Sequence, residues 1–419
     1  MIVFSLILLL LAVFGAPLFT IIASSAMLGY QSQEIDLMAI AIEIAGLAGM
    51  PFLSAIPLFT FAGYLLSESE APGRLVRLSG ALLGWVPGGL ALVALAACAL
   101  FTAFTGASGV TIIALGAILY PALQQDKYPE NFNLGLVTTS GSLGLLFAPS
   151  LPLILYGVVA EVSIDALFRA GFLPGVLMLV MLSAYSLWVG RRNEQPLKRF
   201  SFGELAAAIK ESRWEIPLPL VVLGGIYSGF FAVSEAAAIT ALYVLIVEVF
   251  IQREVSLTEL PRVMRDSMLL VGGILVILGV SLASTNYMID AGVPQQLLSF
   301  VAGFVNSQGS FLALLLVFLL LLGAILDIFA AIVLVVPLIL PIAAQYDVNP
   351  IHLGIVFLAA MQLGYLTPPV GLNLFIASYR FDKPIMQVYL ATLPFLLILM
   401  LSVVLITYWP DLSLLLVAD

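Results

Sequence analysis

The chain has 419 residues, of which 62% are hydrophobic and only 9% are charged, whereas charged residues make up about a quarter of an average soluble domain. A water-soluble fold cannot bury so much apolar surface, so the sequence predicts an all-α polytopic membrane protein with the lipid bilayer as its solvent. The formal net charge of −9 is scattered without a long run of one sign, and no nucleic-acid partner is expected.

The first segment, Ile2 to Leu28, is largely apolar and long enough to cross about 30 Å of hydrocarbon. The first basic residue is Arg74, so the segment lacks the positive start of a cleaved signal peptide and is expected to be a retained helix. Ile216 to Phe231 is a further apolar stretch of spanning length. The single cysteine, Cys98, excludes an intrachain disulfide.

The first half of the chain, residues 1–189, contains two interrupted apolar segments. A helical hairpin is predicted at about residues 88–121, because small and polar residues at 104–109 break the apolar run before it resumes. An interrupted helix is predicted at about residues 133–160, where Pro149 removes a backbone donor and clashes with the preceding turn. Free backbone groups at membrane depth are tolerated only beside protein or a hydrated cavity, so both breaks indicate a binding site.

A polar connector, residues 190–215, follows near the midpoint of the chain. The positive-inside tendency places it in the cytoplasm, because it holds many of the basic residues. These are Arg191, Arg192, Lys198, Arg199, Lys210 and Arg213.

The second half, residues 216–419, repeats the pattern with a hairpin at about 309–341 and an interrupted helix at about 351–379. Adding 220 to the residue numbers of the first half gives the same helix-breaking residues in the second half: Pro121 falls on Pro341, Gly144 on Gly364 and Pro149 on Pro369. A structural repeat is the favoured interpretation. The alternative is that glycine and proline only permit close packing and kinks in continuous helices.

The breaks supply candidate ligands. Half-helix amino termini present a positive dipole end to an anion, and unwound carbonyls with hydroxyls suit a hard cation such as Na⁺. The candidate cation ligands are Thr105, Gly106, Ser108 and Gly144 in the first half, and Gly323, Asp327, Thr367 and Pro368 in the second. Asp327 is the only acidic residue between Asp290 and Asp347, and it is either a ligand or the N-cap of the outgoing helix, or both.

The candidate anion-binding residues lie beside the same breaks: Ser108, Thr139, Ser140, Pro149, Ser150 and Asn373. Hydroxyls at 138–142 approach the first break, although such hydroxyls also often bond to their own preceding turn. Glu235 is expected to open a helix beside an N-cap at Ser234, and His352 is expected at the surface.

Two other classes of protein share parts of this pattern. An ion channel or passive pore would use the same half-helix ends. Gly106 to Gly109 also matches the Gly-x-Ser-Gly nucleophile pattern of rhomboid intramembrane proteases, but a serine nucleophile needs a positioned base, and the sole histidine lies in a polar turn. The protease is therefore the less favoured alternative.

The whole chain resembles the large membrane subunit of tripartite ATP-independent periplasmic (TRAP) transporters, within the ion transporter superfamily. Several blocks carry the resemblance: Ile56 to Phe59, Thr105 to Thr111, Gly144 to Tyr156, Leu167 to Gly171, Gly225 to Gly229 with Ser234 to Ala238, and Leu366 to Leu374. The family usually has a second serine at the position of Ala107, so one hydroxyl ligand of the first cation site is missing here.

The resemblance implies two inverted repeats, each with a re-entrant hairpin and a discontinuous helix, in an elevator-type transport domain beside a scaffold. It implies secondary active uptake rather than enzymatic activity, coupled to two or more Na⁺ ions, in the bacterial inner membrane. It also implies a small membrane subunit and a periplasmic binding protein that delivers a small organic anion: a C4-dicarboxylate, sialic acid or another carboxylate.

Overall fold

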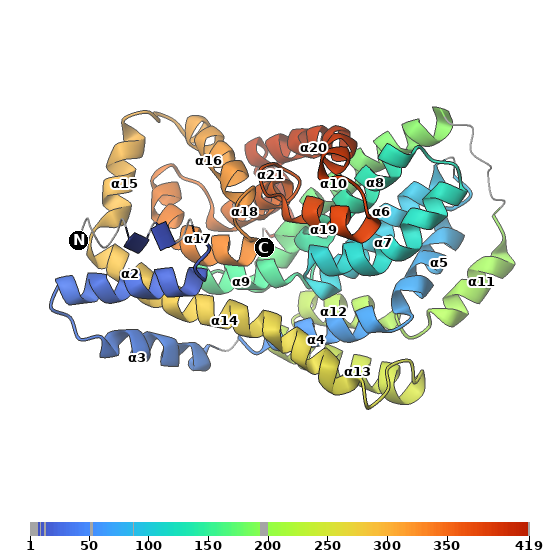
Figure 1. The fold of residues 1–419 in the computed structure, drawn as a ribbon, viewed down its shortest axis with the longest axis horizontal. Coiled ribbons are helices and arrows are strands. Elements are labelled where there is room, and N and C mark those ends of the chain that lie inside the picture. The colour runs from blue at the N-terminus through green and yellow to red at the C-terminus, as the bar shows by residue number, and fades with distance from the viewer. Residues whose placement is uncertain are drawn as a thin grey trace.

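The protein was analysed in a computed structural model, which describes residues 7, 8, 10, 11, 14–50, 53–86, 88–192 and 200–417. All regular elements within these ranges are helices (Figure 1), as the composition predicted. The first half contains α2 (Leu18–Ser32), α3 (Met38–Gly46), η1 (Leu47–Gly49), α4 (Ala55–Glu68), α5 (Ala71–Leu83), α6 (Gly89–Thr105), α7 (Ser108–Gln125), α8 (Glu130–Ser140), η2 (Leu143–Leu146), α9 (Leu151–Val159) and α10 (Ile164–Arg192).

The connector contributes α11 (Phe202–Glu211), and residues 193–199 of the predicted connector lie outside the described residues. The second half contains α12 (Pro217–Tyr227), α13 (Val233–Leu245), η3 (Ile246–Ile251), α14 (Leu260–Asp290), α15 (Val293–Ala302), α16 (Gln308–Gly323), α17 (Ile328–Gln345), α18 (Pro350–Gly364), α19 (Leu372–Phe381), α20 (Ile385–Tyr408) and α21 (Asp411–Leu414).

Six helices in the described residues are long and apolar enough to cross a membrane. They are α7, α10, α13 with η3, α14, α17 and α20. A seventh span results if α8 with η2 and α9, which meet at a bend of 43°, form one broken crossing. The protein is therefore a multi-pass membrane protein, and irregular backbone lies between apolar helices.

Two stretches differ from the sequence-based expectation. The predicted span Ile216 to Phe231 is helical only over the 11 residues of α12, about 17 Å, because the chain turns at Gly229 with a φ of +72°. α2 begins only after Pro17, and the predicted helix from Ile2 includes residues outside the description. α14 is a further long helix of 31 residues, and arginines and an aspartate interrupt the apolar pattern at its start.

The helix boundaries of the two halves correspond at the spacing seen in the sequence. α7 shifted by 220 residues coincides with α17, and the left-handed residue after it, Lys127, falls on the left-handed Asp347. The packing partners also exchange between halves. α7 packs on α19 and α17 packs on α9; likewise α8 packs on α20 and α18 on α10, and α13 packs on α4 as α2 does on α14.

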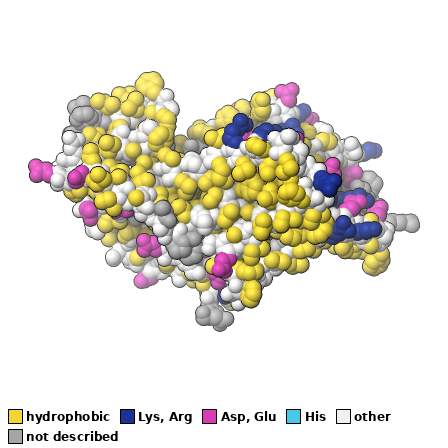
Figure 2. Space-filling view, turned by 90° about the horizontal axis from the view of Figure 1, so that it is seen from below, with side chains coloured by type: hydrophobic (Ala, Val, Ile, Leu, Met, Phe, Trp, Pro, Cys, Tyr) yellow, Lys and Arg dark blue, Asp and Glu magenta, His cyan; other side chains and the backbone are white. Residues whose placement is uncertain are grey.

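The surface carries a broad hydrophobic face, with Lys and Arg side chains gathered at one end (Figure 2). This is the end of the molecule at which α5 and α11 lie in Figure 1. The basic residues beside the connector thus lie at one end of the molecule, whereas Asp and Glu side chains occur at both ends.

Candidate ion and anion site

The tip of the first hairpin is a two-residue break between α6 and α7. Gly106 takes a φ of +64°, and its amide donates to the Thr102 carbonyl at 2.8 Å. A Cβ added to Gly106 would lie 2.5 Å from the side chain of Leu151, the first residue of α9. Glycine is therefore required both by the left-handed backbone and by the close approach of the tip to the first broken helix.

Two hydroxyls beside this tip behave differently. Thr102 Oγ1 donates to the Gly141 carbonyl at 2.9 Å and lies 2.7 Å from Thr111 Oγ1, so it is engaged. Thr105 is fully buried, and its Oγ1 has no hydrogen-bond partner in the described structure. Ser108, also buried, begins α7, at the positive end of that helix. Thr105 thus has a buried hydroxyl that makes no hydrogen bond in the described structure.

The hydroxyl-rich end of α8 is largely satisfied by its own turns. Thr138 Oγ1 donates to the Leu134 carbonyl at 2.6 Å, and Ser140 and Ser142 bond three residues back at 3.3 Å each. Thr139 is the exception, since it is fully buried and its Oγ1 finds no partner among the described atoms. Of the predicted anion-binding hydroxyls on α8, Thr139 is therefore free to bind a ligand and Ser140 is engaged.

The first helix break is closed by backbone contacts. A Cβ on Gly144 would lie 2.3 Å from the Ala99 carbonyl oxygen, so η2 touches the backbone of α6 directly. Pro149 is buried in the break, and Ser150 Oγ donates to the Leu145 carbonyl at 2.5 Å. The predicted ligand Ser150 thus satisfies a carbonyl that the interruption leaves free.

The second hairpin meets the second broken helix in a matching way. A Cβ on Gly364 would lie 2.3 Å from the carbonyl carbon of Gly323, so α16 and α18 meet backbone to backbone. The Ala324 carbonyl accepts the amides of Val370 and Gly371 at 3.2 and 3.3 Å. The hairpin tip therefore docks on the interruption between α18 and α19.

Asp327 caps α17 and is held by a tyrosine that sequence reasoning missed. Its Oδ2 accepts the Phe329 amide at 3.0 Å, while its Oδ1 accepts the Tyr365 hydroxyl at 3.0 Å. The Tyr365 hydroxyl in turn accepts the Ile328 amide at 3.0 Å. The carboxyl group is thus a helix cap, and Asp327 remains exposed at the hairpin tip.

The other two cation candidates of the second half are less favourably placed. Thr367 Oγ1 donates to the Leu363 carbonyl at 2.9 Å, and Pro368 is exposed. Thr367 could offer its remaining lone pair to a cation. Gly323, Asp327, Thr367 and Pro368 lie around one interruption, where Gly323 contacts Gly364 and Asp327 contacts Tyr365.

Asn373 joins the two halves. It is fully buried in the first turn of α19, and its Nδ2 lies 3.5 Å from the Thr138 carbonyl of α8. Its backbone amide donates across the break to Tyr365 at 3.2 Å, whereas its Oδ1 has no partner in the described part of the chain. A Cβ on Gly109 would lie 2.7 Å from Ile376, so the first hairpin tip also reaches α19.

Gln362 is a further buried polar group that sequence reasoning missed. It lies fully buried on α18, and neither its Nε2 nor its Oε1 has a partner within the described ranges. The available signal was a lone amide inside the apolar run of residues 353–364. Buried unpaired amides are costly, so a ligand or an ordered water is the expected partner.

Two capping and surface predictions were wrong. His352 is buried, with Nδ1 3.2 Å from Ser413 Oγ and Nε2 3.2 Å from the Thr407 carbonyl, because α21 folds over the start of α18. Both nitrogens of the sole histidine are therefore engaged away from Ser108. α13 begins after Ala232, and Glu235 caps it by accepting the Ala232 amide at 2.9 Å in place of Ser234.

The unpaired buried oxygens beside the helix breaks are the hydroxyls of Thr105 and Thr139 and the amide oxygens of Gln362 and Asn373. Such oxygens suit a hard cation rather than a transition metal, and the hydroxyls can also donate to an anion. No group of three His, Cys, Asp or Glu side chains that could hold a metal occurs in the described residues. An alkali cation held by carbonyls and hydroxyls needs no such group.

Interrupted apolar helices that meet at buried polar groups are typical of membrane transporters. A family model for the DctM component of the tripartite ATP-independent periplasmic transporter matches residues 2–412. The chain belongs to this family, and it is a multi-pass protein of the bacterial inner membrane.

Three curated relatives illustrate the similarity. The C4-dicarboxylate TRAP transporter large permease protein DctM of Pseudomonas aeruginosa is 35% identical over 363 residues, covering 86% of this chain and 85% of that protein. The sialic acid large permease protein SiaM of Vibrio cholerae is 28% identical, covering 96% and 93%. The isethionate permease protein DctMQ of Oleidesulfovibrio alaskensis is 33% identical, covering 94% of this chain but 61% of that protein.

A solved structure supports the fold alone. The Alcanivorax borkumensis YdaH transporter superimposes with a TM-score of 0.60 at 15% sequence identity, covering 89% of this chain and 87% of that one.

Proposed function

We propose that this chain carries a small organic anion into the cell by secondary active transport driven by Na⁺. The anion is a C4-dicarboxylate, sialic acid or another carboxylate, and two or more Na⁺ ions accompany it. The observation that carries the proposal is the pair of interrupted helices, each docked on a hairpin tip and each leaving buried oxygens without partners.

The proposal includes two inverted repeats. Support comes from the exchange of packing partners, since the hairpin helix of each half lies on the broken helix of the other. Such reciprocal contacts are expected when two copies of one unit pack around a two-fold axis. The hairpins and broken helices would form the transport domain, and α2, α4, α13 and α14, which pack on one another, would form the scaffold of an elevator.

Na⁺ coupling follows from the order in which the oxygens can be satisfied. A cation at Thr105 and the carbonyls of the first hairpin tip would neutralise part of the lone-pair repulsion there and fix the tip. The anion would then meet the amino end of α7 and the Asn373 and Thr139 side chains in a preformed arrangement. Without Na⁺, part of the binding free energy of the anion is used to order the hairpin tip, so the affinity for the anion rises with Na⁺ concentration.

The partners proposed are those of the family. A periplasmic binding protein would deliver the anion, and a small membrane subunit would enlarge the scaffold. The relative named DctMQ supports the second partner, because this chain accounts for 61% of its length and the remainder is long enough for a further membrane subunit.

Uptake by proteoliposomes tests the proposal. The chain, its small subunit and its binding protein are assayed with labelled C4-dicarboxylates, sialic acid and isethionate, under an inward Na⁺ gradient or equimolar K⁺. Accumulation of one anion only with Na⁺ and the binding protein is expected. Equal accumulation in K⁺, or current without any anion, would contradict Na⁺-coupled uptake and favour a passive pore.

A further inference from the structure

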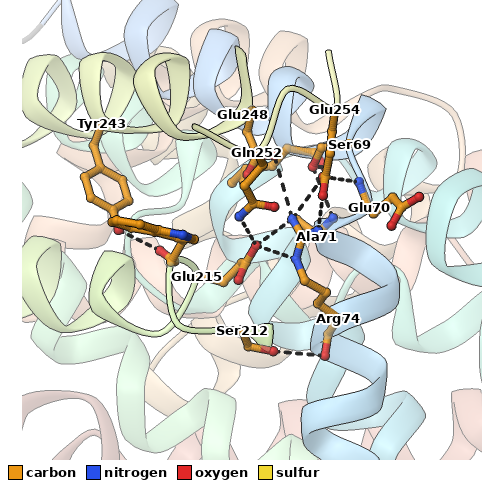
Figure 3. Close-up of polar contacts among 12 residues, drawn as sticks. Ser69, Glu70, Ala71, Arg74, Ser212, Glu215, Tyr243, Glu248, Gln252 and Glu254 are labelled. Atoms are coloured by element: carbon orange, nitrogen blue, oxygen red, sulfur yellow. Dashed lines mark hydrogen bonds and ion pairs between the residues drawn. The ribbon is translucent and has the colours of Figure 1, made fainter. Parts of the chain in front are cut away.

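An ionic cluster lies apart from the helix breaks, where α5 meets the end of α13 and the turn before α12. Figure 3 shows Arg74 of α5 pointing toward Glu215, Glu248 and Glu254. The exposed fraction of the side chain is 12% for Arg74, 4% for Glu215, 1% for Glu248 and 18% for Glu254. One guanidinium thus faces three carboxyl groups in an almost fully buried setting.

Two of the carboxyl groups are tightly bonded to Arg74. Glu215 Oε1 accepts from Arg74 Nε at 2.7 Å and from Nη2 at 2.6 Å, and it also accepts from Gln252 at 3.3 Å. Glu254 forms a two-point contact with Nη1 and Nη2 and accepts the Glu70 amide at 2.9 Å. Burial alone would raise the pKa of Glu254, but these hydrogen bonds outweigh it and hold the pKa below its usual value.

Glu248 lacks such support. Its Oε2 lies 3.7 Å from Arg74 Nη2, beyond hydrogen-bond distance, and this oxygen has no hydrogen-bond partner in the described residues. The Ser69 hydroxyl lies beside the Glu248 carboxyl group, but its hydrogen also has the Leu66 carbonyl as an acceptor, at 3.0 Å. Arg74 is neutralised by its two bonded carboxylates, so an ionised Glu248 would be a buried charge without compensation.

Within the described residues, the charged groups that act on Glu248 are Arg74 on α5, Glu254 in the loop after η3, and Glu215 in the turn before α12. Two further arginines pair with other carboxylates. Arg262 of α14 pairs with Glu68 at the end of α4, and Arg77 of α5 pairs with Glu211 of α11, both at 2.5 Å.

We propose that this cluster is a proton-binding site, with the proton on the Glu248 carboxyl group at neutral pH. With this proton bound, the cluster of Arg74 and its three carboxyl groups carries a net charge of −1 rather than −2. A cavity of about 450 Å³, lined by Ser69, Glu70 and Arg74, opens beside the cluster and gives water access to it. Proton loss in alkaline solution therefore weakens the junction of α5 with α13.

The stability of the full chain in lipid nanodiscs tests the site. A group that binds a proton in the native state at a pH where the unfolded chain has released it makes stability fall as pH rises. The wild-type Tm should fall by about 3 °C or more between pH 6 and pH 9. Glu248→Gln, which keeps the shape of the protonated group, should remove that fall. The matched control Glu70→Gln, at an exposed position on the same junction, should keep it.

Infrared spectroscopy provides a second measurement that does not depend on the variant's stability. The C=O band of a protonated carboxyl group should be present in the wild type at neutral pH and lost reversibly in alkaline buffer. Parallel Tm profiles for the wild type and Glu248→Gln, or no such band, would overturn the proposal. A Na⁺-dependent rise in Tm that only Glu248→Gln abolishes would assign the site to a metal cation and would also overturn it.

Discussion

Single buried oxygens distinguish ligand candidates from ordinary membrane hydroxyls in this protein. Thr105 and Thr138 are both fully buried threonines near the first hairpin, but Thr138 bonds to its own turn and Thr105 does not. The sequence alone does not distinguish these two threonines, because the difference depends on which backbone carbonyl the side-chain rotamer can reach. Of the hydroxyls that the sequence proposed beside the first break, the structure leaves Thr105 and Thr139 without partners and engages Ser140 and Ser150.

Thr105→Val should therefore weaken Na⁺ binding without harming the fold. Losing one oxygen ligand costs about 1.4 kcal/mol, or about tenfold in Na⁺ affinity, while removing an unpaired buried hydroxyl leaves the Na⁺-free protein as stable as before or more so. Titrating Na⁺ against K⁺ while following Tm measures both quantities. Thr138→Val should change Na⁺ affinity by less than about twofold. Equal effects of the two substitutions would remove Thr105 from the site.

At the scale of elements, the positions of glycine and proline predicted the helix interruptions well, whereas the burial of polar side chains was harder to predict. The breaks after Thr105 and Gly323 fall where small residues interrupt the apolar runs, because a positive φ or a backbone contact there excludes a side chain. His352 was placed at the surface because its sequence neighbours are polar. Its burial depends on α21, a short helix 60 residues further along, which no local pattern reveals.

Two substitutions of Asp327, at the start of α17, distinguish its role as a helix cap from a role of its negative charge. Asn retains the side-chain oxygen that accepts the Phe329 amide but loses the one that accepts the Tyr365 hydroxyl, so Asp327→Asn should cost about 1 kcal/mol of stability. Asp327→Ala loses the cap as well and should cost about 2 kcal/mol. Both are read from Tm in the absence of Na⁺.

Na⁺ affinity of the same two variants decides whether the carboxylate also binds an ion. If Asp327 is only a cap, Asp327→Asn keeps the wild-type Na⁺ dependence of Tm and uptake. A tenfold or greater loss of Na⁺ affinity in Asp327→Asn, with the Na⁺-free protein still folded, would show that the negative charge itself is a ligand.

At the scale of the whole molecule, the two halves share helix boundaries at one offset and exchange packing partners. The sequence offset of 220 residues anticipated the correspondence, but not the exchange, since contacts between residues more than 200 positions apart leave no mark on local patterns. The identity of the anion is equally remote from the sequence. In the proposed mechanism, backbone dipoles and amide groups recognise a carboxylate charge, and the binding protein that delivers the anion selects the molecule.

The ratio of Na⁺ to anion entry tests the central claim most directly. Radioactive Na⁺ and labelled anion are followed in the same proteoliposomes, at zero membrane potential, for the wild type and Thr105→Val. The proposed pair of cation sites predicts that two or more Na⁺ ions enter with each anion, and that Thr105→Val needs more Na⁺ for the same rate. Anion entry that proceeds without Na⁺ entry would contradict the account.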